Sequence, residues 1–400
     1  MKAIVARSWF DGTRHHAEPV TIVVDDDRIA EVLPGDRATG LPTTRCGFVM
    51  PGLVEAHCHL FLDGGELDFA ARTRHLDAPF ERMMEVARAN VGRNLAAGVT
   101  LVRDAGDRYG VNHAIRAGSR TLAVRSAGIA LRRPGRYGAF MAREIATLED
   151  ARAAVRELAA TADDLKIIET GIIDFESGTV KGAPQFDAET LGAIVRCAHE
   201  AGLRTFAHCS GTEGIGVAVD AGVDSIEHGF FMTVDILRRM ADRGTAWVPT
   251  FSPVHFQWRR PELAGWSPPT IAKLCAILDS HAEHVAMAAR LGVNLVAGSD
   301  AGSPGVVHGA ALIDEIRHFL DCGLAMDQTL RAATSLPRRL WGAEAADVAR
   351  GQRVDLTMLD ADPFDDPVHL GAVAAVLHPD RAGAVASEVP PAAGREAAPR

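Results

Sequence analysis

The sequence contains very little lysine, few aromatic side chains and no long hydrophobic run. The 42 basic residues include only Lys2, Lys166, Lys181 and Lys273 as lysines, and tyrosine occurs just 2 times. No apolar stretch reaches the roughly 18 to 20 residues that cross a bilayer, so we expect no membrane association. The N-terminal segment Met1–Arg7 becomes charged too early for a secretory signal, and we therefore expect a cytoplasmic protein.

The sequence also lacks an excess of positive charge and any paired spacing of cysteines. A formal net charge of -10 argues against nucleic-acid binding, which needs a basic surface. The 6 cysteines are scattered, which is typical of a chain with reduced thiols. Hydrophobic residues make up 47% of the 400 residues, enough to bury a large core.

Short apolar runs alternate with longer helical stretches between about residues 52 and 300. The helical stretches include "PFERMMEVARANVGRNLAAG" and "AETLGAIVRCAHEAG", which end in Ala-Gly, a suitable helix C-cap. This alternation predicts a parallel α/β architecture of the size of a (β/α)8 TIM-like barrel, with an open doubly wound sheet as the alternative. The strand-like runs are Leu53–Leu60, Val99–Arg103, Leu122–Ala130, Leu165–Thr170, Leu203–Cys209, Val223–Glu227, Ala246–Thr250 and Val293–Ser299.

The two ends of the chain have a different pattern. Residues 1 to 48 alternate and break at turn residues, as strands in hairpins do. Residues 308 to 335 look helical, and residues 351 to 364 return to strand and turn, so they can pair with the N-terminal strands. The stretch from 386 to 400 is rich in proline and alanine, and we expect a disordered tail there.

The segment "PGLVEAHCHL" places two imidazoles one residue apart in an apolar strand. Residues i and i+2 of a strand face the same side, so His57 and His59 project together and Cys58 projects away from them. At the C-terminal mouth of a barrel, where barrel active sites lie, such a pair suits a metal ion such as zinc. Two hydrogen-bonded core histidines are the alternative for an isolated motif.

Three further polar residues end separate strand-like runs. His208 ends "LRTFAHC", His228 ends "VDSIEHG", and Asp300 ends "VNLVAGSD". Because the C-terminal ends of barrel strands share one rim, these residues are expected to converge with His57 and His59. The sequence therefore favours a metal centre over isolated core histidines.

Lys166 lies in "DDLKIIETG", within the fourth strand-like run of a lysine-poor chain. A lysine whose ammonium snorkels to the surface is the alternative. A desolvated lysine instead has a lowered pKa and a neutral, nucleophilic amine. Such an amine can add carbon dioxide and become a carbamate, which can bridge two metal ions.

With these motifs together, the chain resembles the amidohydrolase superfamily, in particular its imidazolonepropionase-related and prolidase-like dipeptidase branch. The motifs that carry the resemblance are "PGLVEAHCHL", "AHCSG", "SIEHG" and "AGSDAG", with support from "GVTLVRDAG" and "RAATSLPRRLWG". The resemblance implies a barrel over residues 51–349. It also implies a small β-sandwich domain built from residues 1–50 and 350–385.

The resemblance implies a role for each motif residue. His57, His59 and Asp300 would bind the more buried of two divalent metal ions, expected to be zinc, and His208 and His228 would bind the more exposed one. Lys166, as its carbamate, would bridge the two ions together with a hydroxide. Asp300 would act as general base and then as general acid while the hydroxide attacks a C–N amide bond.

The expected substrate is a small molecule: a dipeptide, an N-acyl amino acid or a cyclic amide. Relatives usually carry a Gly-Gly-His loop after strand three, whereas this chain has "LRRPGRYGAFMA", so the substrate stays open. Arg132 and Arg136 on that loop are candidates to hold a substrate carboxylate, and His255 is a candidate to line the pocket. Family resemblance also allows a homo-oligomer.

Three other functions remain open at this stage. A lactonase or phosphotriesterase could use the same binuclear centre, because a hydroxide attacks esters as well as amides. A mononuclear deaminase would lack the strand-four lysine and would carry a glutamate where this chain has Gly211. A non-catalytic scaffold relative would be expected to lose ligands, and all six are present.

Overall fold

Parallel strands close into a (β/α)8 barrel, which confirms the predicted fold class and excludes an open sheet. The computed structural model describes residues 1–378. Hydrogen bonds join the end of the first barrel strand to the segment after the last one, from Asp300 N to His57 O (2.7 Å) and from Ala56 N to Ala297 O (3.1 Å). The barrel strands are β6 (Leu53–Cys58), β7 (Val99–Asp104), β8 (Ala123–Ser126), β11 (Asp164–Ile168), β14 (Arg204–Cys209), β15 (Ser225–His228), β16 (Ala246–Val248) and β17 (Asn294–Leu295).

The barrel ladder is parallel throughout. β6, β7 and β8 pair in that order, and a second run joins β9 (Ala130–Arg132), β11, β14, β15, β16 and β17. The short strand β10 (Ala142–Glu144) lies beside β9. Every residue of β6, β7 and β11 is buried, as expected for strands covered by side chains on one face and by helices on the other.

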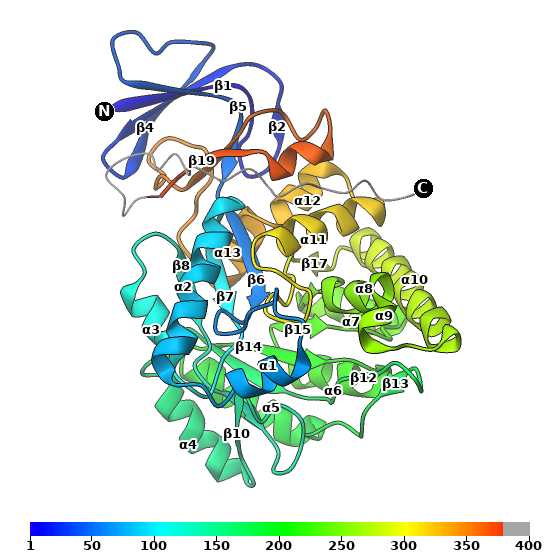
Figure 1. Ribbon diagram of the computed structural model, residues 1–400. Coiled ribbons are helices and arrows are strands. Elements are labelled where there is room, and N and C mark those ends of the chain that lie inside the picture. Colours follow the sequence, from blue (N-terminus) through cyan, green and yellow to red (C-terminus); the bar gives the residue numbers. More distant parts are fainter. Residues whose placement is uncertain (379–400) are drawn as a thin grey trace.

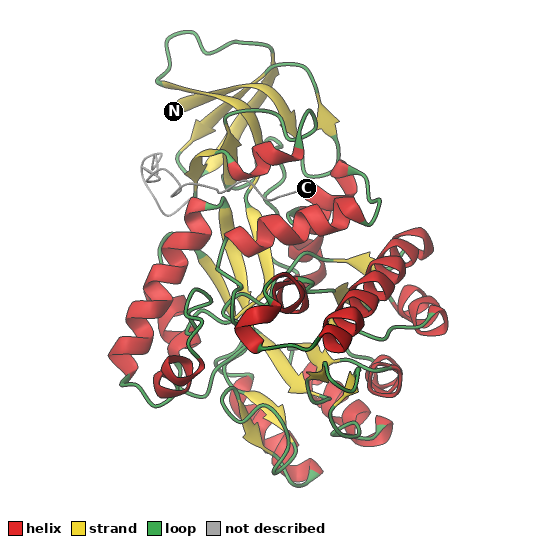
Figure 2. Ribbon diagram, turned by 45° about the vertical axis from the view of Figure 1, so that its right-hand side comes forward, coloured by secondary structure: helices red, strands yellow, loops and turns green. Residues whose placement is uncertain are grey.

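Helices surround the barrel, as Figure 2 shows in red around the yellow strands. Their ends carry the expected caps: Thr147 and Asp150 form a capping box, and Gly244 follows a helix with φ 73°. No helix within residues 1–378 is long and apolar enough to span a membrane. The helices are α1 (Phe69–His75), α2 (Phe80–Ala96), α3 (Val111–Gly118), α4 (Leu148–Leu158), α5 (Ala188–Glu200), α6 (Thr212–Ala221), α7 (Val234–Arg243), α8 (Ser252–Arg259), α9 (Pro261–Ala264), α10 (Pro268–Leu291), α11 (Ala310–Asp321), α12 (Met326–Ala332) and α13 (Ser335–Trp341), with the 3-10 helix η1 (Pro367–Gly371).

A seven-stranded sheet built from both ends of the chain lies beside the barrel (Figure 1). Its central order is β19-β18-β5-β1-β3-β4, with β2 paired to β1, and its own apolar core includes Ile4, Ile22 and Leu356. The domain limits 1–50 with 350–385 remain our interpretation, and residues 379–385 of this range, like the expected tail at 386–400, lie outside the described residues. The strands are β1 (Lys2–Phe10), β2 (His15–His16), β3 (Val20–Asp25), β4 (Arg28–Pro34), β5 (Thr43–Pro51), β18 (Leu356–Leu359) and β19 (Val373–Leu377).

The structure differs from the expected elements in three places. The run Leu122–Ala130 is not one strand, because the chain leaves β8 at Ser126 and Gly128 adopts φ 66° before β9 begins. The last barrel strand, β17, has only 2 residues. The longest helix, α10, was not foreseen, although Ser267 caps it and Pro268 and Pro269 occupy its first turn.

A buried ion pair joins the barrel to the segment that leads into β18. Arg338 Nη2 on α13 lies 2.7 Å from Asp355 Oδ2 and also donates to Thr100 Oγ1 (3.0 Å) at the start of β7. The side chains of Arg338 and Asp355 are 7% and 8% exposed. Because both charges have left water, each depends on the other for compensation.

Removing one charge of this pair is predicted to destabilise the whole fold. The substitution Asp355→Asn keeps the shape but leaves the Arg338 guanidinium buried without a counter-charge, which costs about 3 kcal/mol of unfolding free energy. Thermal unfolding should show a midpoint several degrees below that of the wild type. The control Glu85→Gln removes an exposed pair with Arg82 and should shift the midpoint hardly at all. Equal midpoints for the two variants would contradict a structural role for the pair.

Candidate metal centre

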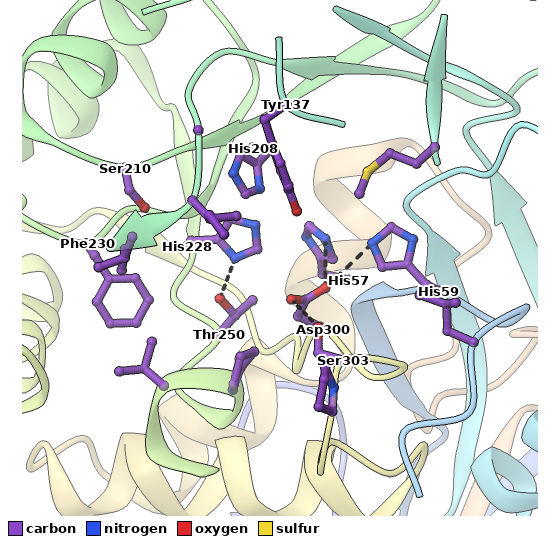
Figure 3. A pocket seen from close by; sticks show the side chains of 18 of the residues that line it. His57, His59, Tyr137, His208, Ser210, His228, Phe230, Thr250, Asp300 and Ser303 are labelled. Carbon is purple, nitrogen blue, oxygen red and sulfur yellow. Dashed lines mark hydrogen bonds and ion pairs between the residues drawn. The ribbon is translucent and has the colours of Figure 1, made fainter. Parts of the chain in front are cut away.

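The structure brings together all six residues that the sequence motifs singled out. His57 and His59 come from the end of β6, Lys166 from β11, His208 from β14, His228 from β15, and Asp300 from the loop after β17. Figure 3 shows the imidazoles and the Asp300 carboxylate facing one space at the mouth of the barrel. Cys58 and Cys209 point away from this space into the apolar core, as the strand alternation predicts.

The ligand atoms in the cluster lie close together. Asp300 Oδ1 is 3.5 Å from His57 Nε2 and 3.6 Å from His59 Nε2, and this trio forms a group that can hold a metal ion, with all three atoms within 4.8 Å of one another. On the other side of His57, the ring of His228 lies 5.0 Å away and that of His208 lies 4.5 Å from His228.

The outer nitrogens of three of the four rings have a hydrogen-bond partner, and the partners of His57 and His59 set the tautomers of those two rings. His57 Nδ1 donates to Glu227 Oε2 (2.6 Å) and His59 Nδ1 donates to the carbonyl of Gly106 (3.1 Å). His228 Nδ1 lies 2.7 Å from Thr250 Oγ1. Since a neutral imidazole carries one proton, the Nε2 lone pairs of His57 and His59 are left facing the cluster.

His208 also has a ring nitrogen that is available to a metal ion. Its Nε2 is buried and has no hydrogen-bond partner among the described residues. A buried polar atom without a partner is costly unless something else satisfies it. The donor set of imidazole nitrogens and a carboxylate therefore fits a transition-metal ion such as zinc.

Burial keeps these imidazoles neutral. Desolvation lowers the pKa of His59 and of His208 to about 3 and holds those of His57 and His228 well below their usual value, with Lys166 adding a repulsive charge. Neutral imidazole is the form that binds metal ions.

Lys166 is a buried amine that lines the same cavity as the four histidines. Its side chain is 1% exposed, and Nζ lies 3.5 Å from His57 Nε2. Burial lowers the pKa of the Lys166 ammonium, which makes the neutral amine easier to reach. The surface-snorkelling alternative for this lysine is therefore wrong, since the ammonium does not reach solvent.

The sequence did not predict the network of buried charged residues behind His57. Glu227, the residue before His228, accepts from His57 Nδ1 with one oxygen and from Arg103 Nη2 (2.8 Å) and Ser225 Oγ (2.6 Å) with the other. Arg103 is 2% exposed, and its guanidinium lies 4.1 Å from the ring centre of Phe206. The only sequence signal was a charged residue inside each of two apolar strands.

The backbone at the rim is held in unusual conformations. His228, Thr250 and Asp300 have φ of 68°, 48° and 57°, a left-handed region that non-glycine residues rarely adopt. Glu55 connects the two sides of the barrel seam, where the end of β6 meets the segment after β17. It accepts from His57 N (2.9 Å) and from Ser299 N (2.9 Å). These conformations and contacts depend on tertiary packing, and no local sequence pattern predicts them.

A glycine is needed at position 298, where the segment after β17 passes close to the end of β6. A Cβ on Gly298 would lie 2.9 Å from His57 N and 2.6 Å from the side chain of Val248. Glycine at this position therefore lets the chain carry Asp300 against the histidines.

A cavity of about 330 Å³ opens over the cluster. It brings in residues that sequence reasoning missed, among them Arg72 on α1, Phe230 after β15, and Tyr137, whose phenol points toward the cluster in Figure 3. Tyr137 lies on the loop after β9, within the stretch "LRRPGRYGAFMA". Only its place in that loop hinted at a role.

The three predicted substrate contacts lie elsewhere. Arg132 donates to Arg136 O and Glu144 Oε1, and Arg136 donates to the carbonyl of Ala183. The His255 ring packs at 4.6 Å from that of His318. None of the three belongs to the described lining of the cavity, so the structure gives their predicted role no support.

Comparisons with known proteins agree with this geometry. The profile of the amidohydrolase family matches residues 48–385. An uncharacterized protein of Mycobacterium tuberculosis is 30% identical over 343 residues, which cover 84% of this chain and 83% of that protein. Ochratoxinase of Aspergillus niger is 28% identical over 282 residues, covering 69% of this chain and 56% of its own length.

Solved structures show the same fold. The crystal structure of A. niger ochratoxinase superposes with a TM-score of 0.78 at 25% identity, covering 95% of this chain and 94% of that one. A Xaa-Pro dipeptidase with bound methionine superposes with a TM-score of 0.79 at 24% identity, covering 95% of this chain and 98% of that one.

Arg103 is predicted to support metal affinity through Glu227 and His57. The substitution Arg103→Lys keeps the charge but has one nitrogen in place of the two, Nε and Nη2, from which Arg103 donates to Ala56 O and to Glu227. Metal affinity, measured by competition with a chromophoric chelator, should fall about 10- to 100-fold. Arg338→Lys changes a similarly buried arginine–carboxylate pair elsewhere and should leave the affinity unchanged. An unchanged metal affinity in folded Arg103→Lys would show that the network of Arg103 and Glu227 does not affect metal binding by His57.

Proposed function

The chain belongs to the amidohydrolase family and is a hydrolase of carbon–nitrogen bonds, and from this premise we propose a binuclear metal-dependent amidase that acts on small substrates. The observation that carries the proposal is the convergence of His57, His59 and Asp300 within 4.8 Å, with a buried lysine beside them. The substrate would be a dipeptide, an N-acyl amino acid or a cyclic amide.

We assign the ligands as follows. His57, His59 and Asp300 would hold one divalent ion, and His208 and His228 the second. Support comes from the fixed tautomers of His57 and His59 and from the unpartnered Nε2 of His208. Zinc binds well to imidazole and carboxylate ligands such as those at this barrel mouth.

Lys166 is proposed to carry a carbamate formed from carbon dioxide. The side chain lines the same cavity as the four histidines, with Nζ 3.5 Å from His57 Nε2 and 4.7 Å from the ring centre of Phe206. A buried ammonium would repel two cations, whereas a carbamate anion would attract both. Arg103 is a cation near Lys166 that would add to this attraction, whereas Glu227 and Asp300 place negative charge nearby.

The chain's own residues supply proton transfer and orientation. When bound, divalent cations polarise a carbonyl and acidify water so that water can act as a nucleophile near neutral pH. Asp300 directs Oδ1 at the histidines while Oδ2 accepts from Ser303 Oγ (2.9 Å), so its carboxylate is held in one orientation. From there it can take a proton from water and give it to the leaving nitrogen. Tyr137 can donate its phenol proton toward the substrate carbonyl oxygen.

The other functions have less support. Gly211 sits at the N-cap of α6 with no side chain to move a proton, which speaks against a mononuclear deaminase. A scaffold would not need ligand atoms held by Glu227, Gly106 and Thr250. Lactones and phosphotriesters form a second substrate class for the same centre. The substrate screen described next includes them.

Hydrolysis should be detected in a screen of dipeptides, N-acyl amino acids, cyclic amides, lactones and phosphotriesters. The matched control is Asp300→Asn, which is predicted to lower kcat at least about 100-fold while KM changes much less, because proton transfer is lost and binding is kept. Amide turnover that survives in Asp300→Asn would remove this residue from the mechanism. A wild-type enzyme that cleaves esters and no amide would overturn the proposed bond.

Lys166→Ala is predicted to lose most activity and most bound metal. Small carboxylic acids such as acetate or propionate should restore part of both, because they can occupy the space left by the carbamate. Metal content and kcat are measured with and without the acid. Lys273→Ala removes an exposed lysine and should change neither. Full metal content and activity in Lys166→Ala would rule out a bridging role.

A further inference from the structure

The cavity over the cluster has two chemically different sides. One side is apolar and lies next to His228, and the other carries the guanidinium of Arg72, which is bonded to Gly302, two residues from Asp300. Two different sides can hold a substrate in one orientation. The role that we assign to each side rests on the proposed amide hydrolysis.

The apolar side is formed by Phe230, Val254, Ile173 and Phe175. Phe230 and Val254 are buried, and they belong to one apolar cluster with Ile173 and Phe175 of the hairpin that contains β12 (Ile173–Asp174) and β13 (Thr179–Val180). Figure 3 shows Phe230 beside His228 and Thr250, on the side of the cavity remote from His59. No charged side chain of the described lining belongs to this wall.

The opposite side carries Arg72, the only arginine in the described lining of the cavity. Arg72 Nη1 donates to the carbonyls of Asp63 (2.6 Å) and Glu66 (3.1 Å), and Nη2 donates to that of Gly302 (2.7 Å). The guanidinium is thereby held between two loops. These bonds use three of its five N–H groups, so Nε–H and one Nη2–H have no acceptor in the described chain.

The position of Arg72 relative to Asp300 identifies the part of the substrate that it can reach. Asp300 gives its proton to the leaving nitrogen, so the amine half of the substrate lies on the Asp300 side. Arg72 and Asp300 line the same cavity, and Gly302, whose carbonyl accepts from Arg72 Nη2, is two residues from Asp300. A guanidinium with two free N–H groups is suited to bind a carboxylate.

We infer that Arg72 binds the carboxylate of the amine half of an N-acyl amino acid, while the acyl half lies against the wall of Ile173, Phe175, Phe230 and Val254. In the reaction the oxygen of water bonds to the acyl carbon and the C–N bond breaks. The nitrogen leaves with the bonding pair and takes a proton from Asp300. The products are a carboxylic acid with an apolar group and a free amino acid.

Two substrates that differ only in the carboxylate test this assignment: N-benzoyl-phenylalanine and N-benzoyl-phenethylamine. The wild type should prefer the first by about 10- to 100-fold in kcat/KM, the effect of one charge-assisted contact. Arg72→Met should abolish the preference and keep hydrolysis of the neutral amide, and Arg72→Lys should retain part of the preference. Arg93→Met is the control, because Arg93 donates to Asp63 on the same loop but lies outside the cavity lining.

The outcomes separate this inference from the proposed function. Equal kcat/KM for the two amides in the wild type, or an equal fall for both in Arg72→Met, would overturn the role of Arg72 while amide hydrolysis stands. Absence of hydrolysis of either amide, beside cleavage of esters only, would overturn the proposed function and this inference with it.

The acyl half is tested by chain length. For N-acetyl-, N-butanoyl- and N-hexanoyl-phenylalanine, kcat/KM should rise by up to about fourfold per added methylene, as apolar surface leaves water. Ile173→Ser lies on a half-buried surface hairpin and should flatten this rise without unfolding the barrel. A flat series in the wild type would overturn the assignment of the apolar wall.

Discussion

The closure of the barrel between β6 and the segment after β17 is the contact on which the candidate centre depends. The hydrogen bond from Asp300 N to His57 O (2.7 Å) brings a carboxylate from the end of the barrel to two imidazoles from its beginning. Glu55 strengthens this seam with bonds to His57 N and Ser299 N, and Gly298 leaves the space that the two strands need. Without the seam, the two halves of the ligand set would lie on separate strands with no fixed distance between them.

The second constraint is burial of many basic groups in one small volume. Four imidazoles and an amine out of water favour neutral forms, and the neutral forms are the ones that bind metal ions or add carbon dioxide. Two carboxylates supply negative charge. Asp300 faces the cluster, and Glu227 lies behind His57, where Arg103 balances its charge. The arrangement thus combines neutral donors with a buried ion pair that orients one of them.

The sequence predicted the barrel, its approximate strand positions and the six residues that converge at its mouth, because each of these leaves a local pattern. Strand alternation placed His57 and His59 on one face, and polar residues at the ends of apolar runs marked His208, His228 and Asp300. The pocket wall was not predictable in this way. Arg72 reaches the cavity because carbonyls of two separate loops hold its guanidinium, and Tyr137 reaches it with a ring that lies 5.2 Å from that of His208. Arg132 and Arg136, which their position on the loop after strand three suggested, bond instead to that loop and its surroundings.

The metal content per chain tests the central claim most directly. Protein purified without chelator, in the presence of bicarbonate, is analysed by elemental mass spectrometry against protein concentration. A binuclear centre built around Lys166 predicts about two equivalents of zinc or a similar divalent ion per chain. About one equivalent would contradict the bridging role of Lys166 and favour a mononuclear enzyme. No metal, with none taken up on reconstitution, would contradict the assignment of His57, His59, His208, His228 and Asp300 as ligands.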